Sequence, residues 1–242
     1  MVGCLIEEDG QVVAEGFHQQ AGGPHAEVVA LQNLGRKPKD GAVLYVSLEP
    51  CSSTGRTPPC TSAILDAGIK NVVVCAIDPD SRHAGHGLEL LRNQGVEVVL
   101  APPEIGERAA RLNFIFNQYV ITGRPLIALK MATSANGMVA ERAGYPSRVT
   151  GEAARADVMR WRRLFPSICV GSGTVIADDP SLTARLPDAE WCPVRIVVDS
   201  TLATLSPAFA PRKVYTDEHA HRTLVLTTTR GMENREAVAQ AQ

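Results

Sequence analysis

The sequence lacks the long apolar run that a membrane-spanning helix requires. None of its hydrophobic stretches approaches the ~20 residues that cross a bilayer. Its opening, MVGCLIEEDG, has neither the basic region nor the apolar region of a signal peptide. The sequence therefore predicts a soluble, cytoplasmic protein with no membrane partner, and its six cysteines are expected to be thiols or metal ligands.

The sequence also lacks an excess of either sign of charge, and it has few aromatic side chains. Lys and Arg number 24 against 26 Asp and Glu, and aromatic residues make up 5% of the chain. Binding of nucleic acid draws on a basic surface and on stacking aromatic rings, so the composition predicts no nucleic-acid partner. With 242 residues, 45% of them hydrophobic, the chain is long enough for one large or two modest domains.

Predicted strands and helices alternate along the first half of the chain. Short, near-continuous apolar stretches predict buried strands at 42–48, 71–77 and 96–100. Apolar residues at helical spacing predict helices at 25–34, 61–67, 88–94 and 104–120. Asp9-Gly10, between 3–7 and 12–17, predicts a hairpin turn. Such alternation favours an α/β fold with a largely parallel sheet covered on both faces.

A second domain is predicted after Thr122-Gly123-Arg124-Pro125, which interrupts the helical pattern. The predicted domains are therefore residues 1–122 and residues 123–242. Strands are expected in the second domain at 126–132, 168–170, 195–198 and 223–227. A helix is expected at 152–165, with a buried apolar stripe made of Ala154, Val158, Trp161 and Phe165.

The residues that carry chemistry are His25, Glu27 and two cysteines that each follow a proline, Cys51 and Cys60. One imidazole and two thiolates are three protein ligands, and a catalytic zinc keeps its fourth tetrahedral position for water. Zinc deaminases carry an H-x-E…P-C-x-x-C signature in which the glutamate is an acid/base and not a ligand. The pattern therefore predicts zinc at His25, Cys51 and Cys60, with Glu27 as the catalytic acid/base.

Two other interpretations of the cysteines stay open. Cys51 and Cys60 would form a disulfide in an oxidising compartment, although no export signal points to one. A purely structural zinc would need a fourth protein ligand, for which Cys75, His83 and His86 are available.

The cysteines are separated by eight residues, in the run EPCSSTGRTPPC at 49–60. This run resembles the deaminase domain of the bifunctional riboflavin-biosynthesis deaminase-reductase family, as do VGC at 2–4 and GGPHAE at 22–27. The resemblance implies a three-layer, cytidine-deaminase-like fold and a diaminopyrimidinone substrate that bears a ribosyl phosphate. Ser53, Thr54 and Asp80 depart from the usual pattern of that family.

Segments of the second domain resemble the reductase domain of the same family: LKMATSANG at 129–137, GTVIADDP at 173–180 and RIVVDS at 195–200. The resemblance implies a partial dihydrofolate-reductase-like domain, incomplete at its C-terminal end, with NADPH as a second cofactor beside one zinc ion per chain. It implies NADPH contacts by Ala132, Arg148, Thr174, Asp178 and Ser200. It implies substrate contacts by Arg162, Leu182 and Arg185.

The function expected is therefore zinc-dependent deamination of the pyrimidine nucleotide, followed by NADPH-dependent reduction of its ribosyl side chain to ribityl. The chain is expected to be truncated at both ends relative to the family, with little reduction and a tendency to self-associate. The partner expected is a small-molecule substrate, and a homo-oligomer is left open. The alternatives are a deaminase of another nucleotide or of a nucleic-acid base, and a non-catalytic zinc-binding remnant of such an enzyme.

Overall fold

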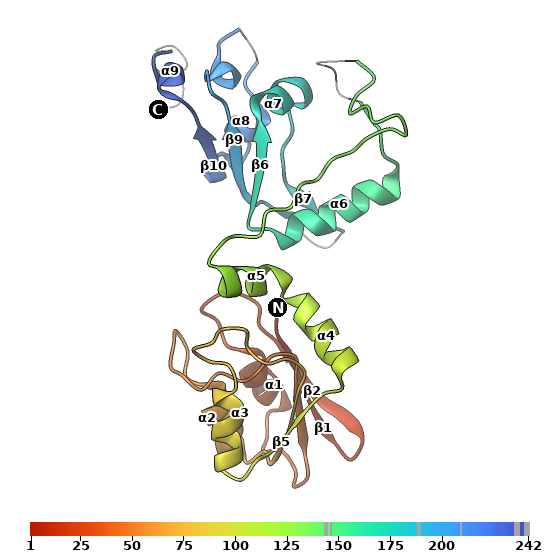
Figure 1. Ribbon diagram of the computed structural model, residues 1–242, viewed down its shortest axis with the longest axis vertical. Coiled ribbons are helices and arrows are strands. Elements are labelled where there is room, and N and C mark those ends of the chain that lie inside the picture. The colour runs from red at the N-terminus through yellow and green to blue at the C-terminus, as the bar shows by residue number, and fades with distance from the viewer. Residues whose placement is uncertain (143–144, 146, 188–189, 209, 235–237, 240–242) are drawn as a thin grey trace. The chain divides into compact units, whose positions relative to one another are not determined.

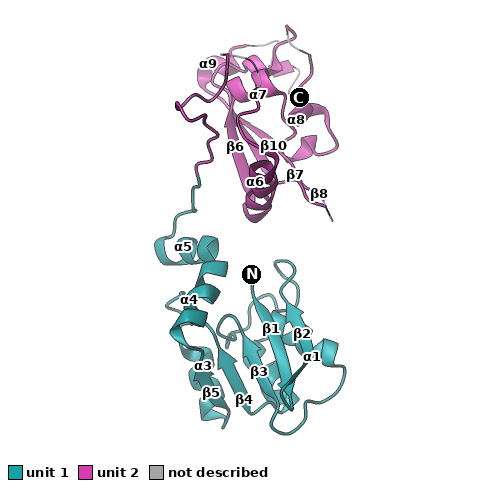
Figure 2. Ribbon diagram, turned by 90° about the vertical axis from the view of Figure 1, so that its right-hand side faces the viewer, with its two compact units in different colours: residues 1–128 teal, residues 129–242 magenta. Residues whose placement is uncertain are grey.

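The structure is a computed structural model that describes residues 1–142, 145, 147–187, 190–208, 210–234 and 238–239 (Figure 1). It divides into two compact units, residues 1–128 and residues 129–242 (Figure 2). Each unit has its own buried hydrophobic core. Among the described residues, none of the helices has both the length and the apolar character needed to span a bilayer.

The first unit is built on a five-stranded sheet with the order β2-β1-β3-β4-β5. Its strands are β1 (Gly3–Glu8), β2 (Gln11–Phe17), β3 (Val43–Val46), β4 (Asn71–Val74) and β5 (Glu97–Leu100). β3, β4 and β5 are parallel, whereas β1 is antiparallel to both β2 and β3. The predicted hairpin is confirmed, with Asp9 at φ 53° and Gly10 at φ 76°. Because that hairpin supplies two antiparallel strands, the sheet is mixed and not largely parallel.

A layer of three helices covers one face of the sheet of the first unit. Its members are α1 (Ala26–Leu34), α2 (Cys60–Ala67) and α3 (His86–Asn93). α1 packs on β1 and β2, α2 contacts both α1 and α3, and α3 packs on β5. Fully buried aliphatic side chains from strands and helices meet between these layers, including those of Ile6, Leu44, Ile64, Val74 and Leu91. This core holds α1 and α2 on the sheet.

The single helix predicted over 104–120 is two helices in the structure, α4 (Pro103–Leu112) and α5 (Phe114–Thr122). The break lies at Asn113, whose backbone has φ −108° and ψ 21°. Its buried side-chain oxygen accepts a hydrogen bond from the amino group of Met1. Asparagine is a poor interior helix residue because its short side chain competes for hydrogen bonds in non-helical conformations, and the backbone of Asn113 leaves the helical conformation here.

The second unit holds a parallel three-stranded sheet with the order β10-β9-β6. The strands are β6 (Ser167–Gly171), β9 (Val194–Val198) and β10 (Thr223–Leu226), and a short hairpin joins β7 (Ala184–Arg185) to β8 (Glu190–Trp191). The three strands of the sheet confirm the strands predicted over 168–170, 195–198 and 223–227. The helices are α6 (Glu152–Leu164), α7 (Ser172–Asp178), α8 (Lys213–Thr216) and α9 (Thr229–Met232), with 3-10 turns η1 (Ala203–Leu205) and η2 (Ala220–Arg222).

Two predictions for the second unit were wrong. Residues 126–132 form no strand, and Ile127 and Leu129 are 87% and 85% exposed. A strand forms only when a neighbouring strand pairs with its backbone, and no described strand pairs with this segment. The apolar stripe of α6 is not buried either, since Trp161 is 49% exposed and no residue of the helix is fully buried. In the described residues, the helix packs mainly on the short strand β7.

Candidate metal centre

Three predicted metal ligands come from the loops and helix starts at one end of the first sheet. His25 is the N-cap residue of α1, and Cys60 is the first residue of α2. Cys51 lies in the loop that follows β3, and the backbone N–H of Cys60 donates to its Sγ at 3.3 Å. Ligand sites of parallel sheets form where loops leave the carboxyl ends of the strands. β3 supplies such a loop here.

The geometry of these three side chains fits a tetrahedral zinc ion. Nδ1 of His25 lies 3.1 Å from Sγ of Cys60 and 3.5 Å from Sγ of Cys51. The ligand atoms of all three residues lie within 4.8 Å of one another. With a Zn–N bond of about 2.0 Å and a Zn–S bond of about 2.3 Å, tetrahedral ligand atoms lie about 3.5 Å apart. The donor set and the spacing therefore suit zinc held through Nδ1 of the histidine.

The other interpretations of the cysteines find no support in the described part of the chain. Cys51 and Cys60 are both free thiols. The cluster of potential ligands holds only the three residues already named, so Cys75, His83 and His86 do not add a fourth. Three protein ligands leave a coordination position open, which is the arrangement of catalytic zinc and not of structural zinc.

The electrostatics of the two thiols also favour a bound cation. The Cys60 thiol donates to Cys51 and lowers the pKa of that thiol below its usual value. The same interaction, together with burial, raises the pKa of Cys60. Without a bound cation, the two thiols therefore do not both become thiolates. A divalent cation between them would stabilise both thiolates, as would the N-terminus of α2, at which Cys60 lies.

Glu27 lies beside the metal ligands without being one of them. It occupies the first turn of α1 and is 2% exposed. Burial raises the pKa of its carboxyl group, and a hydrogen bond with Cys60 counteracts that shift in part. Because it is outside the ligand cluster, the carboxyl group remains available to carry a proton.

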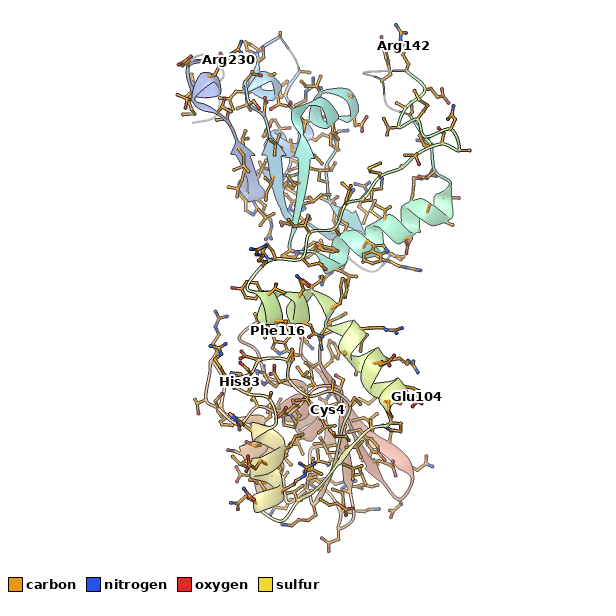
Figure 3. All side chains as sticks on the ribbon, in the orientation of Figure 1. Cys4, His83, Glu104, Phe116, Arg142 and Arg230 are labelled. Atoms are coloured by element: carbon orange, nitrogen blue, oxygen red, sulfur yellow. The ribbon has the colours of Figure 1, made fainter. Side chains whose placement is uncertain are left out.

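A pocket of about 300 Å³ opens over this centre. Polar and charged side chains dominate its lining, which comprises His18, Gly22, His25, Cys51, Ser53, Gly55, Arg56, Thr57, Asp78 and His83 (Figure 3 labels His83). Ser53, one of the departures from the family pattern, is among them, whereas Asp80 binds Arg82 in a 2.5 Å ion pair. The volume is at the lower end of the range of small-molecule sites.

Sequence reasoning missed two residues that contact His25. Oγ1 of Thr57 lies 3.3 Å from Nε2 of His25, so its hydroxyl group accepts the ring proton when Nδ1 binds metal. The ring of His18 meets that of His25 edge-on, with centroids 5.4 Å apart. Thr57 belongs to the GRTPPC run, and its place between two ligands was the only signal that pointed to it.

The structure brings together the three substrate residues predicted in the second unit. Arg162 Nη1 donates to the carbonyl oxygen of Thr183 at 2.6 Å, and Arg185 Nη1 donates to Oγ1 of Thr183 at 3.2 Å. Burial lowers the pKa of Arg162, and the positive charge of Arg185 lowers it further. Leu182, adjacent to Thr183, is buried. Two guanidinium groups that repel each other suit a bound phosphate.

The structure brings together three of the five predicted NADPH residues. Thr174 and Asp178 are exposed on α7, which follows β6, and Ser200 is exposed two residues after the end of β9. Since β6 and β9 are parallel neighbours, these three lie at the same edge of the sheet. Ala132 and Arg148 lie between α5 and α6, where the described residues form neither helix nor strand. No described contact joins these two to the other three.

Two family models match the chain. The model described as "Cytidine and deoxycytidylate deaminase zinc-binding region" matches residues 1–76, which contain all three ligands of the candidate metal centre. The model described as "RibD C-terminal domain" matches residues 125–240.

Curated relatives and solved structures agree with these matches. The chain is 45% identical over 201 residues to the riboflavin biosynthesis protein RibD of Aquifex aeolicus, covering 83% of this chain and 56% of that protein. It is 42% identical to the RibD of Escherichia coli, covering 82% of this chain and 57% of that protein. The chain thus spans little more than half the length of these relatives.

Among solved structures, RibD of Acinetobacter baumannii aligns with a TM-score of 0.79 at 37% identity, covering 99% of this chain and 65% of that one. A diaminohydroxyphosphoribosylaminopyrimidine deaminase/5-amino-6-(5-phosphoribosylamino)uracil reductase from Thermotoga maritima aligns with a TM-score of 0.82 at 38% identity, covering 93% and 62%. Sequence, domain models and fold agree, and the chain belongs to the RibD family of riboflavin biosynthesis proteins.

Proposed function

We propose that this chain deaminates 2,5-diamino-6-(ribosylamino)-pyrimidinone 5′-phosphate in riboflavin biosynthesis. The observation that carries the proposal is the cluster of His25, Cys51 and Cys60, with the buried Glu27 beside it and outside the ligand set. Relatives whose names state this activity share the site region and the fold. The catalytic domain proposed is residues 1–122.

In the proposed reaction, water replaces the ring amino group and ammonia leaves. His25, Cys51 and Cys60 hold zinc, which when bound supplies a Lewis acid that makes water nucleophilic near neutral pH. Glu27 takes a proton from the attacking water and later gives a proton to the departing amine. Burial raises the pKa of this carboxyl group, which makes its carboxylate a stronger base for the first step and helps it to keep the proton that it delivers in the second. Thr57 keeps the imidazole of His25 in the orientation that presents Nδ1.

The pocket offers a cation for the phosphate end of this substrate. Arg56, which lies between the two cysteine ligands in the sequence, lines the pocket. A guanidinium group binds phosphate through paired hydrogen bonds. Ser53, Asp78 and His83 supply further polar groups for the sugar and the ring. Arg56 therefore favours a small substrate that carries a phosphate.

We further propose residues 123–242 as the reductase part of the same pathway enzyme. NADPH supplies the reducing equivalents when bound. The substrate contacts proposed are those of Arg162 and Arg185, which both donate to Thr183 and would bind the phosphate of the deaminated substrate, and of the adjacent Leu182. The NADPH contacts proposed are those of Ala132, Arg148, Thr174, Asp178 and Ser200.

All six cysteines are free thiols, which accords with a cytoplasmic enzyme.

The decisive experiment compares ammonia release from the diaminopyrimidine nucleotide by the wild-type chain and by Glu27→Gln. The variant is expected to keep one zinc per chain while kcat falls by roughly 10²- to 10⁴-fold, the usual contribution of an acid/base. Glu15→Gln, which changes an exposed glutamate on β2, is the matched control and should behave as wild type.

Two results would contradict this proposal, the first its deaminase activity and the second the role of Glu27. One is a wild-type chain that binds a full equivalent of zinc but releases no ammonia from this substrate. The other is a Glu27→Gln variant with near wild-type turnover, which would assign proton transfer to another residue. NADPH oxidation with the deaminated product tests the reductase part independently.

A further inference from the structure

Glu49 is a buried carboxylate next to the metal centre that the proposed chemistry does not use. It is 6% exposed and lies two residues before the ligand Cys51. Its own backbone N–H donates to the carbonyl oxygen of Ala76 at 2.8 Å, just beyond β4. No described lysine, arginine or histidine forms an ion pair with it in the first unit.

Backbone N–H groups from a distant segment take the place of a cationic partner. Oε2 of Glu49 accepts from Asp78 N at 3.2 Å and from Gly85 N at 2.9 Å. Oε1 accepts from Gly87 N at 2.9 Å and from Leu88 N at 3.4 Å. One carboxylate therefore binds both ends of the segment 78–88.

Two of these bonds replace a helix cap that α3 does not have. Its N-cap residue is Gly85, which has no side chain to accept the N–H groups of the first turn. Gly87 and Leu88 belong to that first turn, and both donate to Glu49. A negative charge at a helix N-terminus is also favoured by the helix dipole. Glu49 thus caps α3 from a separate part of the chain.

The two segments approach so closely that only glycine fits between them. A Cβ atom on Gly87 would lie 2.0 Å from the carbonyl oxygen of Pro50 and 3.3 Å from Oε1 of Glu49. The start of α3 therefore rests directly on the backbone that precedes Cys51. The carboxylate and this contact both fix where the segment 78–88 lies relative to the metal loop.

That segment carries part of the pocket wall. Asp78 and His83 line the pocket together with His25 and Cys51. We propose that Glu49 is a positioning residue: by binding both ends of segment 78–88, it holds Asp78 and His83 in place over the metal centre for substrate binding. The inference rests on the proposed deaminase function, and it assigns Glu49 to substrate affinity and not to proton transfer.

The test uses Glu49→Gln in the full chain. The amide has the same shape but keeps only one acceptor oxygen, and its NH₂ group must face N–H donors. We expect KM for the diaminopyrimidine nucleotide to rise about tenfold or more while kcat changes less than threefold and zinc stays at one per chain. Hydrogen exchange of the amides within 78–88 should accelerate by a similar factor. Glu89→Gln, an exposed glutamate in the first turn of the same helix, should change neither quantity.

A second variant separates the position of the segment from the charge of the carboxylate. Gly87→Ala leaves Glu49 intact but pushes the start of α3 away from Pro50, so it should raise KM in the same way. It also carries the test if Glu49→Gln yields no folded protein.

The inference is overturned if Glu49→Gln lowers stability while KM and exchange in 78–88 both stay at wild-type values. A fall in kcat at unchanged KM would also overturn it, because that is the result of a role in the chemical step. If the wild-type chain releases no ammonia, the proposed function has failed, and the exchange measurement alone decides whether Glu49 holds the segment.

Discussion

Three buried glutamates show how neighbouring groups decide what a carboxylate does. Glu8, Glu27 and Glu49 are 3%, 2% and 6% exposed. Burial disfavours the charged form unless hydrogen bonds or a cation replace water. Glu8 has a guanidinium group and Glu49 has four backbone N–H groups of other residues, whereas the hydrogen bonds of Glu27 with its own backbone and with Cys60 offset its burial only in part. The pKa of Glu27 is therefore raised, and this is the glutamate proposed to transfer protons.

Glu8 provides a pH-dependent test of stability. Arg36 donates to both of its oxygens, at 2.9 and 2.7 Å, and Lys39 N donates at 2.9 Å. These bonds lower the pKa of Glu8 from 4.5 to about 2. A lowered folded-state pKa contributes stability above the unfolded-state value and loses it as the pH falls through the folded-state value. Glu8→Gln should therefore be less stable than wild type at pH 7, and the difference should shrink between about pH 5 and pH 2.

Urea unfolding of both proteins at several pH values measures this difference. Glu15→Gln again serves as the control, because that glutamate is exposed and lies on the neighbouring strand β2. A stability difference between wild type and Glu8→Gln that does not vary with pH would show that the charge of Glu8 contributes nothing to folding.

Single residues were predictable from the sequence where their chemistry is rare. His25, Cys51, Cys60 and Glu27 stand out because few roles other than metal catalysis require that set at that spacing. Glu49 did not stand out, since its role depends on four N–H groups that lie at least 29 positions further along the chain. No local pattern reveals such a contact.

At the level of elements, the contact between β2 and α1 sets the position of the active site. α1 begins directly after His25 and carries Glu27 in its first turn. Gly16 on β2 lies beneath this helix, where an added Cβ would come within 2.3 Å of Ala30 N and 2.4 Å of Ala26 O. Both of these atoms belong to the backbone, so neither can move aside without moving the helix.

Gly16→Ala should therefore shift α1 and impair both stability and activity. Overpacking of this kind typically costs about 1–3 kcal/mol, and a shifted helix misplaces His25 and Glu27 together. Urea unfolding and ammonia release at saturating zinc measure the two effects. Gly3→Ala on β1 is the matched control, because its added Cβ meets nothing closer than 4.0 Å. Full activity in Gly16→Ala would show that α1 tolerates displacement.

Elements were predictable where the local signal and the packing agree, and not elsewhere. The helices α1 and α2 end at Leu34 and Ala67, as the apolar spacing predicted, and Gly35 and Gly68 follow them in left-handed conformations. The prediction of one helix over 104–120 was wrong because the backbone leaves the helical conformation at Asn113. The prediction of a strand over 126–132 was wrong because no described strand pairs with this segment, and a local pattern does not show whether a partner exists. Alternation of apolar residues gives the tendency to form a strand but not the neighbour that completes it.

For the whole molecule, the two hydrophobic cores are built from separate stretches of the chain. In the described residues the first core runs from Cys4 to Val98 and the second from Val175 to Val214. The ion pair between the buried Arg195 and the partly buried Asp217, at 2.6 Å, also lies entirely within the second unit. Burial of apolar surface is the main favourable contribution to folding, so each unit contains the interactions that stabilise it.

A chain of residues 1–128 alone should therefore fold and bind one zinc. All three metal ligands, Glu27, and the Glu49 contacts lie inside this range. We expect it to release ammonia with a kcat/KM within about threefold of the 242-residue chain, a difference below 1 kcal/mol. It should oxidise no NADPH, because every proposed NADPH contact lies outside it. Zinc analysis, circular dichroism and the ammonia assay on both chains measure this. A shortened chain that folds and holds zinc but has lost deamination would show that the second unit contributes to the deaminase site, and the reaction would then belong to the pair of units and not to the first alone.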